Sequence, residues 1–219
     1  DEVTERWEEL EVQTGRDGFA ELFGHIRMIF AKEKARRTLL EEFREQVIKK
    51  YESPETLMST VVEPFAEAYL IAKKCQYLST TNAADVNALL KWLNRIENSD
   101  WLPSAIKFLA TQGKNADYVL WFFRKLERLA SFMHICGYDV NQRIERYASV
   151  LAALEGAHST ESSISAVQLT DEEKSKMLQV VDGDIYLMTA RRRNHLLLRL
   201  DAFVGDGAAT YDNGLLTIE

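Results

Sequence analysis

Breaks in helical structure are rare along this chain, whose 219 residues include only three prolines and ten glycines. Both residues destabilise helix interiors, so their scarcity allows many long helices. Between the breaks, apolar residues recur every three to four positions, the period of a helix with one buried face. We expect an all-α fold, a bundle of about ten helices without a fixed-length repeat. The clearest apolar faces are Phe19, Leu22, Phe23, Ile26, Ile29 and Phe30; Val86, Leu89, Leu90, Leu93 and Ile96; and Ile144, Tyr147, Ala148, Leu151 and Leu154.

Local signals mark where helices begin and where one is distorted. Ser53-Pro54 is typical of an N-cap followed by proline at the first helical position. Thr170 opens a capping box with a glutamate three residues later. Pro64 lies inside a helical pattern, where it has no N–H to donate and crowds the preceding turn. We therefore expect a kink near Val61.

The stretch 116–136 is predicted to be the central helix. Leu120, Trp121 and Phe123 add apolar character on faces other than its main stripe. A helix that is apolar on several sides is usually surrounded by other helices, so we expect the aromatic run 121–123 to lie in the core. The main stripe consists of Val119, Phe122, Leu126, Leu129, Met133 and Cys136.

Residues 156–169 are rich in Ser, Thr and Ala and lack a helical period, which predicts a loop or linker. It would separate a helical domain at 1–155 from a C-terminal part at 170–219, which begins with a pair of helices. Near the end, Asn213-Gly214 is a strong signal for a tight hairpin turn. We expect a short C-terminal β-hairpin or strand, formed by two runs. These runs are Ala209–Tyr211 and Leu215–Ile218.

Composition excludes several classes of protein. The chain is 46% hydrophobic, which is enough for a sizeable core, but no apolar run approaches the roughly 20 residues that cross a bilayer. We expect no membrane association. Cys75 and Cys136 are far apart and outside any zinc-ligand spacing. Such cysteines are typical of a reduced, cytoplasmic protein rather than a disulfide scaffold. The net charge is -7, and residues 1–11, with six acids and one arginine, account for -5 of it.

A basic cluster near the C-terminus is the candidate nucleic-acid contact. It comprises Arg191, Arg192, Arg193, His195 and Arg199. Arginine suits phosphate because its planar fork donates two parallel hydrogen bonds. The spacing i, i+3, i+7 places Arg192, His195 and Arg199 on one helical face. The cluster either contacts DNA phosphates or forms a solvated helix whose arginines pair with the acidic N-terminal segment.

Arg128 and His134 form an Arg-x5-His pattern on the central helix. This pattern resembles the Arg-x4-6-His motif of the all-helical HEPN ribonucleases, whose His and Arg meet across a dimer to cleave RNA. Here Leu129 follows the arginine, where that family usually has a polar residue. The alternative is two ordinary residues on a helix surface.

No residue set forms a complete catalytic or metal site. Glu21 and His25 lie one helical turn apart and could hold a metal, but no second pair accompanies them. A bare i, i+4 pair more often supports the helix surface. We therefore expect no catalytic residues, no metal ligands and no cofactor in this chain.

The last fifty residues carry a more specific pattern. An arginine-rich helix leads into Leu196-Leu197-Leu198-Arg199-Leu200-Asp201, and a short link leads to Leu216-Thr217-Ile218-Glu219. This junction resembles that of GmrSD-type, modification-dependent restriction endonucleases. The acidic start with Trp7 and Leu10, the apolar helix at 19–30 and the segment 65–69 are similar to the same family's helical middle region.

The resemblance implies a larger parent protein. In this family the helical region joins a ParB-like, NTP-using N-terminal domain to a C-terminal HNH nuclease domain. The chain would be the middle region, ending just before the nuclease motif His-Ile-Leu-Pro-Gln. It lacks the Asp-Gly-Gln-Gln-Arg signature of the ParB-like domain. The resemblance implies a divalent metal and an NTP for the parent, no enzymatic activity for this chain alone, and DNA and the adjoining domains as partners. A HEPN-like ribonuclease and a helical protein-interaction module are the alternatives.

Overall fold

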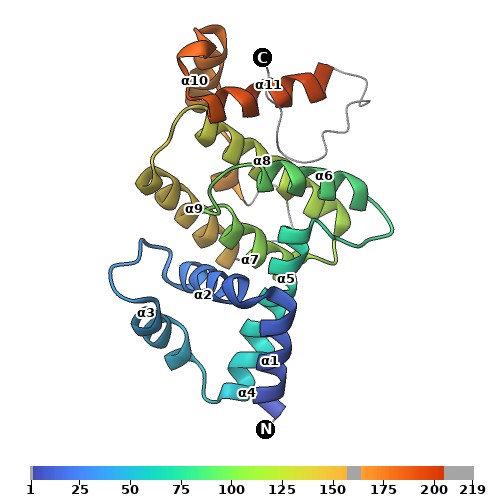
Figure 1. Ribbon diagram of the computed structural model, residues 1–219, viewed down its shortest axis with the longest axis vertical. Coiled ribbons are helices and arrows are strands. Elements are labelled where there is room, and N and C mark those ends of the chain that lie inside the picture. The colour runs from blue at the N-terminus through green and yellow to red at the C-terminus, as the bar shows by residue number, and fades with distance from the viewer. Residues whose placement is uncertain (1, 157–163, 205–219) are drawn as a thin grey trace.

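The computed structural model describes residues 2–156 and 164–204, and this part of the chain is all-α, as predicted. It contains no strand, and the expected C-terminal hairpin lies outside it. Figure 1 shows an elongated molecule with the N-terminus at one end and α10 and α11 at the other. Its helices are α1 (Glu2–Thr14), α2 (Arg16–Ala31), α3 (Leu39–Gln46), α4 (Pro54–Leu57), α5 (Glu63–Lys74), α6 (Ala83–Asn94), α7 (Leu102–Gln112), α8 (Ala116–Ile135), α9 (Val140–Glu155), α10 (Asp171–Asp182) and α11 (Ala190–Val204).

The helix starts expected from the sequence are present. The Ser53 hydroxyl accepts the Thr56 N–H and caps α4, with Pro54 in the first turn. Thr170 and Glu173 form the predicted capping box of α10. Two further capping boxes begin α3 at Thr38 and α9 at Asp139. These caps satisfy N–H groups that have no partner within the helix.

The distortion expected near Val61 takes the form of a π turn. Residues Met58–Val62 are π-helical and run directly into α5, which has Pro64 in its first turn. Proline offers no N–H to the turn before it, and the wider π turn accommodates this missing bond. The turn also keeps Met58, Val61 and Val62 buried.

Helix α8 is the central helix, as predicted, and thirteen of its twenty residues are buried. It packs against α6, α7, α10 and α11. Phe122 and Phe123 are fully buried, and Phe122 stacks on Phe108 of α7 with 3.8 Å between ring centroids. The expectation that this aromatic run lies in the core is confirmed for both phenylalanines, while Trp121 is partly exposed.

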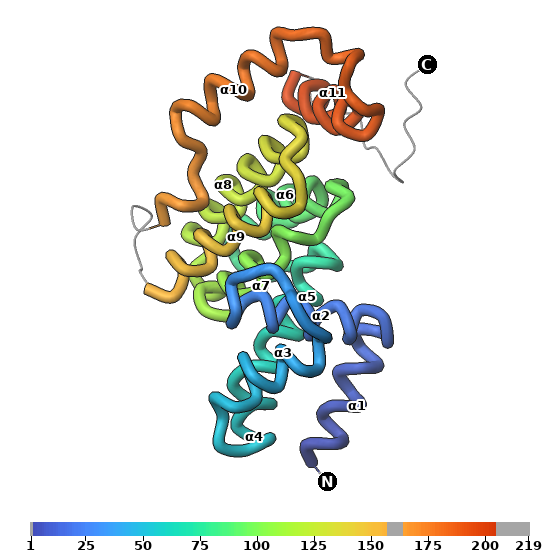
Figure 2. Tube along the Cα trace, turned by 90° about the vertical axis from the view of Figure 1, so that its left-hand side faces the viewer, coloured from blue at the N-terminus to red at the C-terminus, as the bar shows by residue number. Residues whose placement is uncertain are grey.

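The N-terminal half is joined to this core by α2, α5 and α7, which contact one another (Figure 2). Within the N-terminal half, four aromatic rings from α1, α2 and α3 pack together, with 4.9 to 5.1 Å between neighbouring centroids. Their arrangement is mostly edge-to-face, the preferred geometry for aromatic pairs. The four residues are Trp7, Phe19, Phe23 and Phe43.

The described half of the predicted linker, residues 164–169, packs onto the protein. A short 3-10 turn at Ser165–Val167 lies against α8 and α9. Ile164 and Val167 are buried and belong to the main core. Sequence periodicity misses such a segment because two apolar residues in a short turn have no period. None of the described helices is long and apolar enough to cross a bilayer.

Candidate functional site

The five residues of the predicted basic cluster lie on α11 and divide between its two sides. Arg192, His195 and Arg199 share one face, as their spacing predicts, and that face lies against α8. Arg191 and Arg193 contact other elements. The face with the most basic character is therefore turned toward the protein.

Arg192 binds the C-terminal end of α8. Its Nε donates to the Ile135 carbonyl oxygen at 2.9 Å, and Nη2 donates to the same oxygen. A cation is favoured there because the last carbonyls of a helix carry partial negative charge. Gly137 follows in a left-handed conformation, with φ of 71°. A Cβ at Gly137 would come within 2.9 Å of Arg192 Nη1, so glycine serves both the backbone turn and the arginine.

Arg199 forms the second tie, a bidentate ion pair with Glu127 of α8. Its Nε and Nη2 lie 2.8 and 2.9 Å from the two carboxylate oxygens. Glu127 is only 4% exposed, so its charge requires this partner. The Arg199 guanidinium also lies over the ring of Trp92 in α6, 4.9 Å from the ring centroid. Arg95 lies over the same ring, 4.5 Å from its centroid. One arginine thereby ties α11 to both α8 and α6.

His195 forms the third tie, through Ser131. The Ser131 hydroxyl donates to Glu127 at 3.0 Å, because a carboxylate can only accept. With its single proton used, Ser131 accepts from His195 Nε2 at 2.9 Å. Burial lowers the pKa of His195 to about 4, and positive charge from His134, Arg199 and Arg95 adds to the effect. His195 is therefore neutral at pH 7, with its proton on Nε2.

Ser131, His195 and Glu127 do not have the connectivity of a nucleophilic triad. In a triad the serine donates to the histidine, which the acid orients from its other nitrogen. Here the serine lies between the acid and the histidine, and its proton points to Glu127. All three side chains are buried. This chemistry suits a fixed joint between α8 and α11 rather than attack on a substrate.

Arg191 and Arg193 are the two arginines of the cluster whose side chains are not bound to α8; Arg191 is exposed and Arg193 is half-buried. Arg191 pairs with Glu97, just beyond α6, at 2.6 Å, and 75% of its side chain is exposed. Arg193 lies over the Tyr186 ring at 5.6 Å. The expected pairing with the acidic N-terminal segment is not present among the described residues, because the two regions lie at opposite ends of the molecule (Figure 1). Arg191 and Arg199 instead pair with Glu97 and Glu127.

The other sequence candidates do not assemble into sites within the described chain. Arg128 is exposed, while His134 is half-buried beneath α11 with its ring 5.2 Å from that of His195. Burial lowers the pKa of His134. The two residues of the Arg-x5-His pattern thus have different surroundings, and this protomer does not bring them together.

Glu21 and the buried His25 form a polar network between α2 and α5. Their closest atoms are 3.3 Å apart, and Glu21 also accepts from Tyr69 at 2.8 Å and pairs with Lys73 at 3.2 Å. The hydrogen bond with His25, followed by that with Tyr69, lowers the pKa of Glu21 to about 2. No group of three or more potential metal ligands occurs among the described residues.

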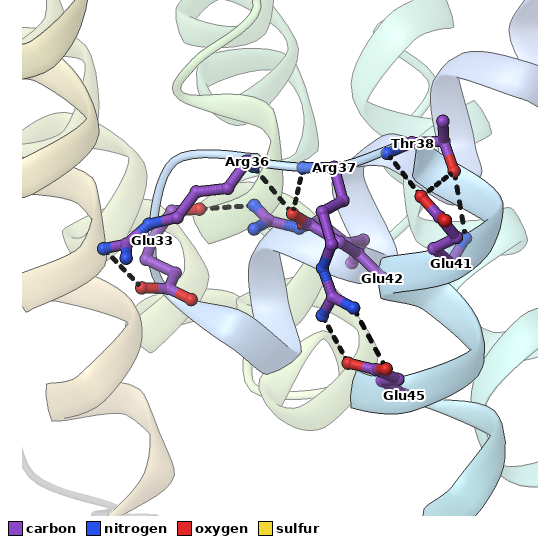
Figure 3. Close-up of polar contacts among 8 residues, drawn as sticks. Glu33, Arg36, Arg37, Thr38, Glu41, Glu42 and Glu45 are labelled. Atoms are coloured by element: carbon purple, nitrogen blue, oxygen red, sulfur yellow. Dashed lines mark hydrogen bonds and ion pairs between the residues drawn. The ribbon is translucent and has the colours of Figure 1, made fainter.

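The loop between α2 and α3 contains a polar clasp that the sequence analysis did not identify. Figure 3 shows its centre, where the Glu42 carboxylate accepts the backbone N–H groups of Arg36 and Arg37 at 2.7 and 2.8 Å. These bonds, the one from Arg36 first, lower the pKa of Glu42. Arg27 pairs with Glu42 and donates to the Glu33 carbonyl, and both charged side chains are buried.

One feature of this clasp is predictable from the sequence, namely the start of α3. Thr38 and Glu41 have the spacing of a capping box, which fixes the start of α3 and with it the position of Glu42. The pairing of Glu42 with Arg27, across the loop, follows from the fold rather than from any local pattern. The clasp holds residues 33–37 in one conformation against α2.

Comparison with known proteins adds no assignment to this geometry. No protein-family model, no curated protein and no solved structure matches the chain at a significant level. The functional statements below rest on the residues and contacts described above.

Proposed function

We propose that this chain is a helical scaffold segment of a GmrSD-like, modification-dependent restriction endonuclease. It would hold an NTP-using ParB-like domain and an HNH nuclease domain at a fixed spacing. The junction pattern that begins on the arginine-rich helix supports the family, and free Cys75 and Cys136 fit a reduced, cytoplasmic setting.

The observation that carries the scaffold role is the anchoring of α11. Three ties, from Arg192, His195 and Arg199, extend over two turns of this helix and reach α8. Contacts at i, i+3 and i+7 fix both the position of a helix and its rotation about its own axis. A flexible linker between domains would need none of them. A segment that must present the following residues in one direction would need all three.

The surface around α11 supports a neighbouring partner. Leu187, Phe203 and Val204 are among the most exposed large apolar residues in the described chain, and Phe203 is 86% exposed. Leu187 precedes α11, whereas Phe203 and Val204 are its last two residues. Adjacent exposed apolar residues such as Phe203 and Val204 often mark a protein–protein contact. We propose that the adjoining nuclease domain of the parent covers them. This observation also favours the second candidate, a helical interaction module without a nucleic-acid role.

Any DNA contact made by α11 would fall on Arg191 and Arg193. Arg192 is bound to the Ile135 carbonyl and Arg199 to Glu127, and moving Arg199 to a phosphate would leave a buried carboxylate without its partner. The structure thus favours a narrower contact than the full cluster predicted from sequence. The HEPN-like alternative gains no support from the separate surroundings of Arg128 and His134.

The coding sequence downstream of Glu219 is the first test of the family. A His-Ile-Leu-Pro-like motif there would support the proposal, and a stop codon would overturn it. The chain alone should not cut DNA, which a plasmid-nicking assay with Mg²⁺, Mn²⁺ and Ni²⁺ measures. Reproducible cleavage that follows the chain through purification would contradict this expectation.

The scaffold role is tested in the complete protein by loosening α11. Glu127→Ala removes the acceptor of Arg199 and Ser131, so DNA cleavage should fall at least about tenfold because the nuclease loses its fixed position. NTP hydrolysis should persist. Glu97→Ala, which removes only the exposed partner of Arg191, is the matched control and should leave cleavage unchanged. Equal cleavage by both variants would show that α11 need not be fixed.

A further inference from the structure

The outer face of α8 carries three cations and a tryptophan over two helical turns. Arg124 and Arg128 are exposed, whereas Trp121 and Lys125 are half-buried. The spacing i, i+3, i+4 and i+7 places all four side chains on one side of the helix. The fully buried Phe122 and the other core residues of α8 lie on different sides. This face runs for about 10 Å along the helix and opens to solvent.

The positive charges on this face lack strong partners. Arg124 lies 4.0 Å from Asp85 of α6, and the two side chains are 62% and 64% exposed. An ion pair of that length and exposure contributes little. The side chains of Lys125 and Arg128 form no ion pair or hydrogen bond with the residues that the structure describes. All three cations are therefore available to an anionic partner.

The neighbouring acids do not neutralise these cations. Glu127 lies within the same two turns, but it is buried and its carboxylate is bound to Arg199. Asp117 lies one turn before Trp121 and accepts a hydrogen bond from Asn82, at the start of α6, at 2.7 Å. Between residues 121 and 128 the solvent-facing charges are thus all positive.

A second tryptophan with arginines continues this face onto α6, which packs beside α8 (Figure 1). Trp92 follows Asp85 by seven residues, or two turns, so both lie on the side of α6 that Arg124 reaches. Arg95 and Arg199 lie over the Trp92 ring, 4.5 and 4.9 Å from its centroid. The junction of α6, α8 and α11 therefore presents two half-buried tryptophans beside arginines, in a protein whose net charge is -7.

We propose that this face binds single-stranded nucleic acid. Arginine and lysine pair with backbone phosphates, and a tryptophan ring offers a flat surface on which a base can stack. A duplex keeps the faces of its bases stacked on one another, so tryptophans beside cations suit a single strand better. The proposed contact is separate from Arg191 and Arg193 of α11, and it does not require the endonuclease assignment.

The experiment is fluorescence anisotropy of the whole chain with a labelled oligothymidylate across a salt series. Arg124→Ala/Arg128→Ala should weaken binding at least about tenfold and lower the log–log salt slope by about 1.4 units, roughly 0.7 for each phosphate contact with a single strand. Arg44→Ala/Lys49→Ala removes the same charge at exposed positions on and just after α3. This control should bind like the wild type.

Trp121 tests the stacking part of the proposal. Trp121→Ala should weaken binding by about tenfold, the effect expected for one stacked base, whereas Trp121→Phe keeps a ring and should lose less. Circular dichroism verifies that both variants remain folded.

Three results would overturn the proposal: no binding by the wild type at low salt, equal binding by Arg124→Ala/Arg128→Ala and its control, or tighter binding to a duplex of the same length. A stop codon after Glu219 would overturn the endonuclease family and leave these measurements unchanged, so the two proposals fail separately.

Discussion

The body of the molecule, α1–α9, and its C-terminal pair, α10 and α11, are held together by different forces. In the body, apolar side chains from α2, α3 and α5–α9 form one continuous core, and α1 packs against it through the partly buried Leu10. In the pair, α10 has no buried residue and α11 has only His195 and Leu196. Leu196 lies outside the main core. Met177 of α10 packs against the core, and the other ties of the pair come mainly from arginine, histidine and glutamate.

This difference separates the stability of the fold from the orientation of one helix. Apolar burial is strong but non-directional, and it changes little with pH or salt. Hydrogen-bonded charges add little net stability, yet they accept only one geometry. Apolar burial therefore stabilises the fold of the body, whereas the polar contacts hold α11 in one orientation. The comparison predicts that the two regions will respond differently to substitution and to pH.

The largest effect should come from the body. Phe122→Ala removes a fully buried ring that stacks on Phe108, so the free energy of unfolding should fall by about 4 kcal/mol. Urea denaturation followed by circular dichroism measures the loss. Leu187→Ala, at an exposed position next to α11, is the control and should change stability by less than about 0.5 kcal/mol. A loss below about 1 kcal/mol for Phe122→Ala would contradict a continuous apolar core.

The next effect should come from the joint. Glu127→Ala leaves Arg199 without its carboxylate and Ser131 without its acceptor. The free energy of unfolding of this region should fall by about 3 kcal/mol. The loss should be local, since the ties concern α11 alone. Hydrogen exchange should accelerate along α11 and stay unchanged in α5 and α7. Uniform acceleration throughout the chain would show instead that joint and body unfold as one unit.

Much of the body was predictable because it follows local rules. Helix periods, the cap at Ser53 and the central position of α8 depend on neighbouring residues, and all are confirmed. The cap at Thr170, in the pair, follows the same rule. The buried face of Ile144, Tyr147 and Leu151 also follows its period, with Ile144 partly exposed. These features are set by residues close together in the sequence, so sequence patterns predict them.

The joint was predictable only in part. The shared face of Arg192, His195 and Arg199 is correct, but its partner is Glu127 rather than the acidic N-terminus. Helical periodicity normally places acidic residues on the exposed face, so periodicity alone does not predict that Glu127 is buried. The available signal was the spacing of Phe123, Glu127 and Ser131, four residues apart, which puts the acid on a buried face. Choosing its partner requires the three-dimensional fold.

The pH response should separate the regions further. His195 has a pKa of about 4 in the folded chain and about 6.5 when unfolded. Between these values the unfolded state binds more protons, so stability is present above pH 6.5 and is lost as pH falls toward 4. From pH 7 to pH 5 the loss should be about 2 kcal/mol. The pKa of Glu21 is also lowered, so its contribution disappears mainly below pH 4.5, outside this interval.

Urea midpoints at pH 7 and pH 5 measure this slope, and NMR titration of the imidazole gives the pKa of His195 directly. His195→Gln should flatten most of the slope. His134→Gln should remove only a smaller part, since its pKa is lowered in the same direction but less strongly. An unchanged slope in His195→Gln would place the pH-sensitive group elsewhere in the protein.

The smallest effect on stability should come from Arg191 and Arg193, the outer pair of arginines on α11. The same substitutions test whether α11 contacts DNA. Arg191→Ala/Arg193→Ala removes one exposed ion pair and one exposed ring contact, so the free energy of unfolding should change by less than about 0.5 kcal/mol. If α11 contacts DNA, the same variant should lose affinity for unrelated duplexes equally, because phosphates carry no base information.

Fluorescence anisotropy with a labelled duplex across a salt series makes the comparison. The log–log salt slope should fall by roughly one unit for each phosphate contact removed. Arg192→Ala/Arg199→Ala should show the reverse pattern, losing thermal stability because both residues tie α11 to α8. If Arg191→Ala/Arg193→Ala leaves the salt slope unchanged while Arg192→Ala/Arg199→Ala lowers it, the contact between α8 and α11 must open when DNA binds. If neither pair changes the slope, α11 is purely structural and the scaffold role stands without a DNA contact on this helix.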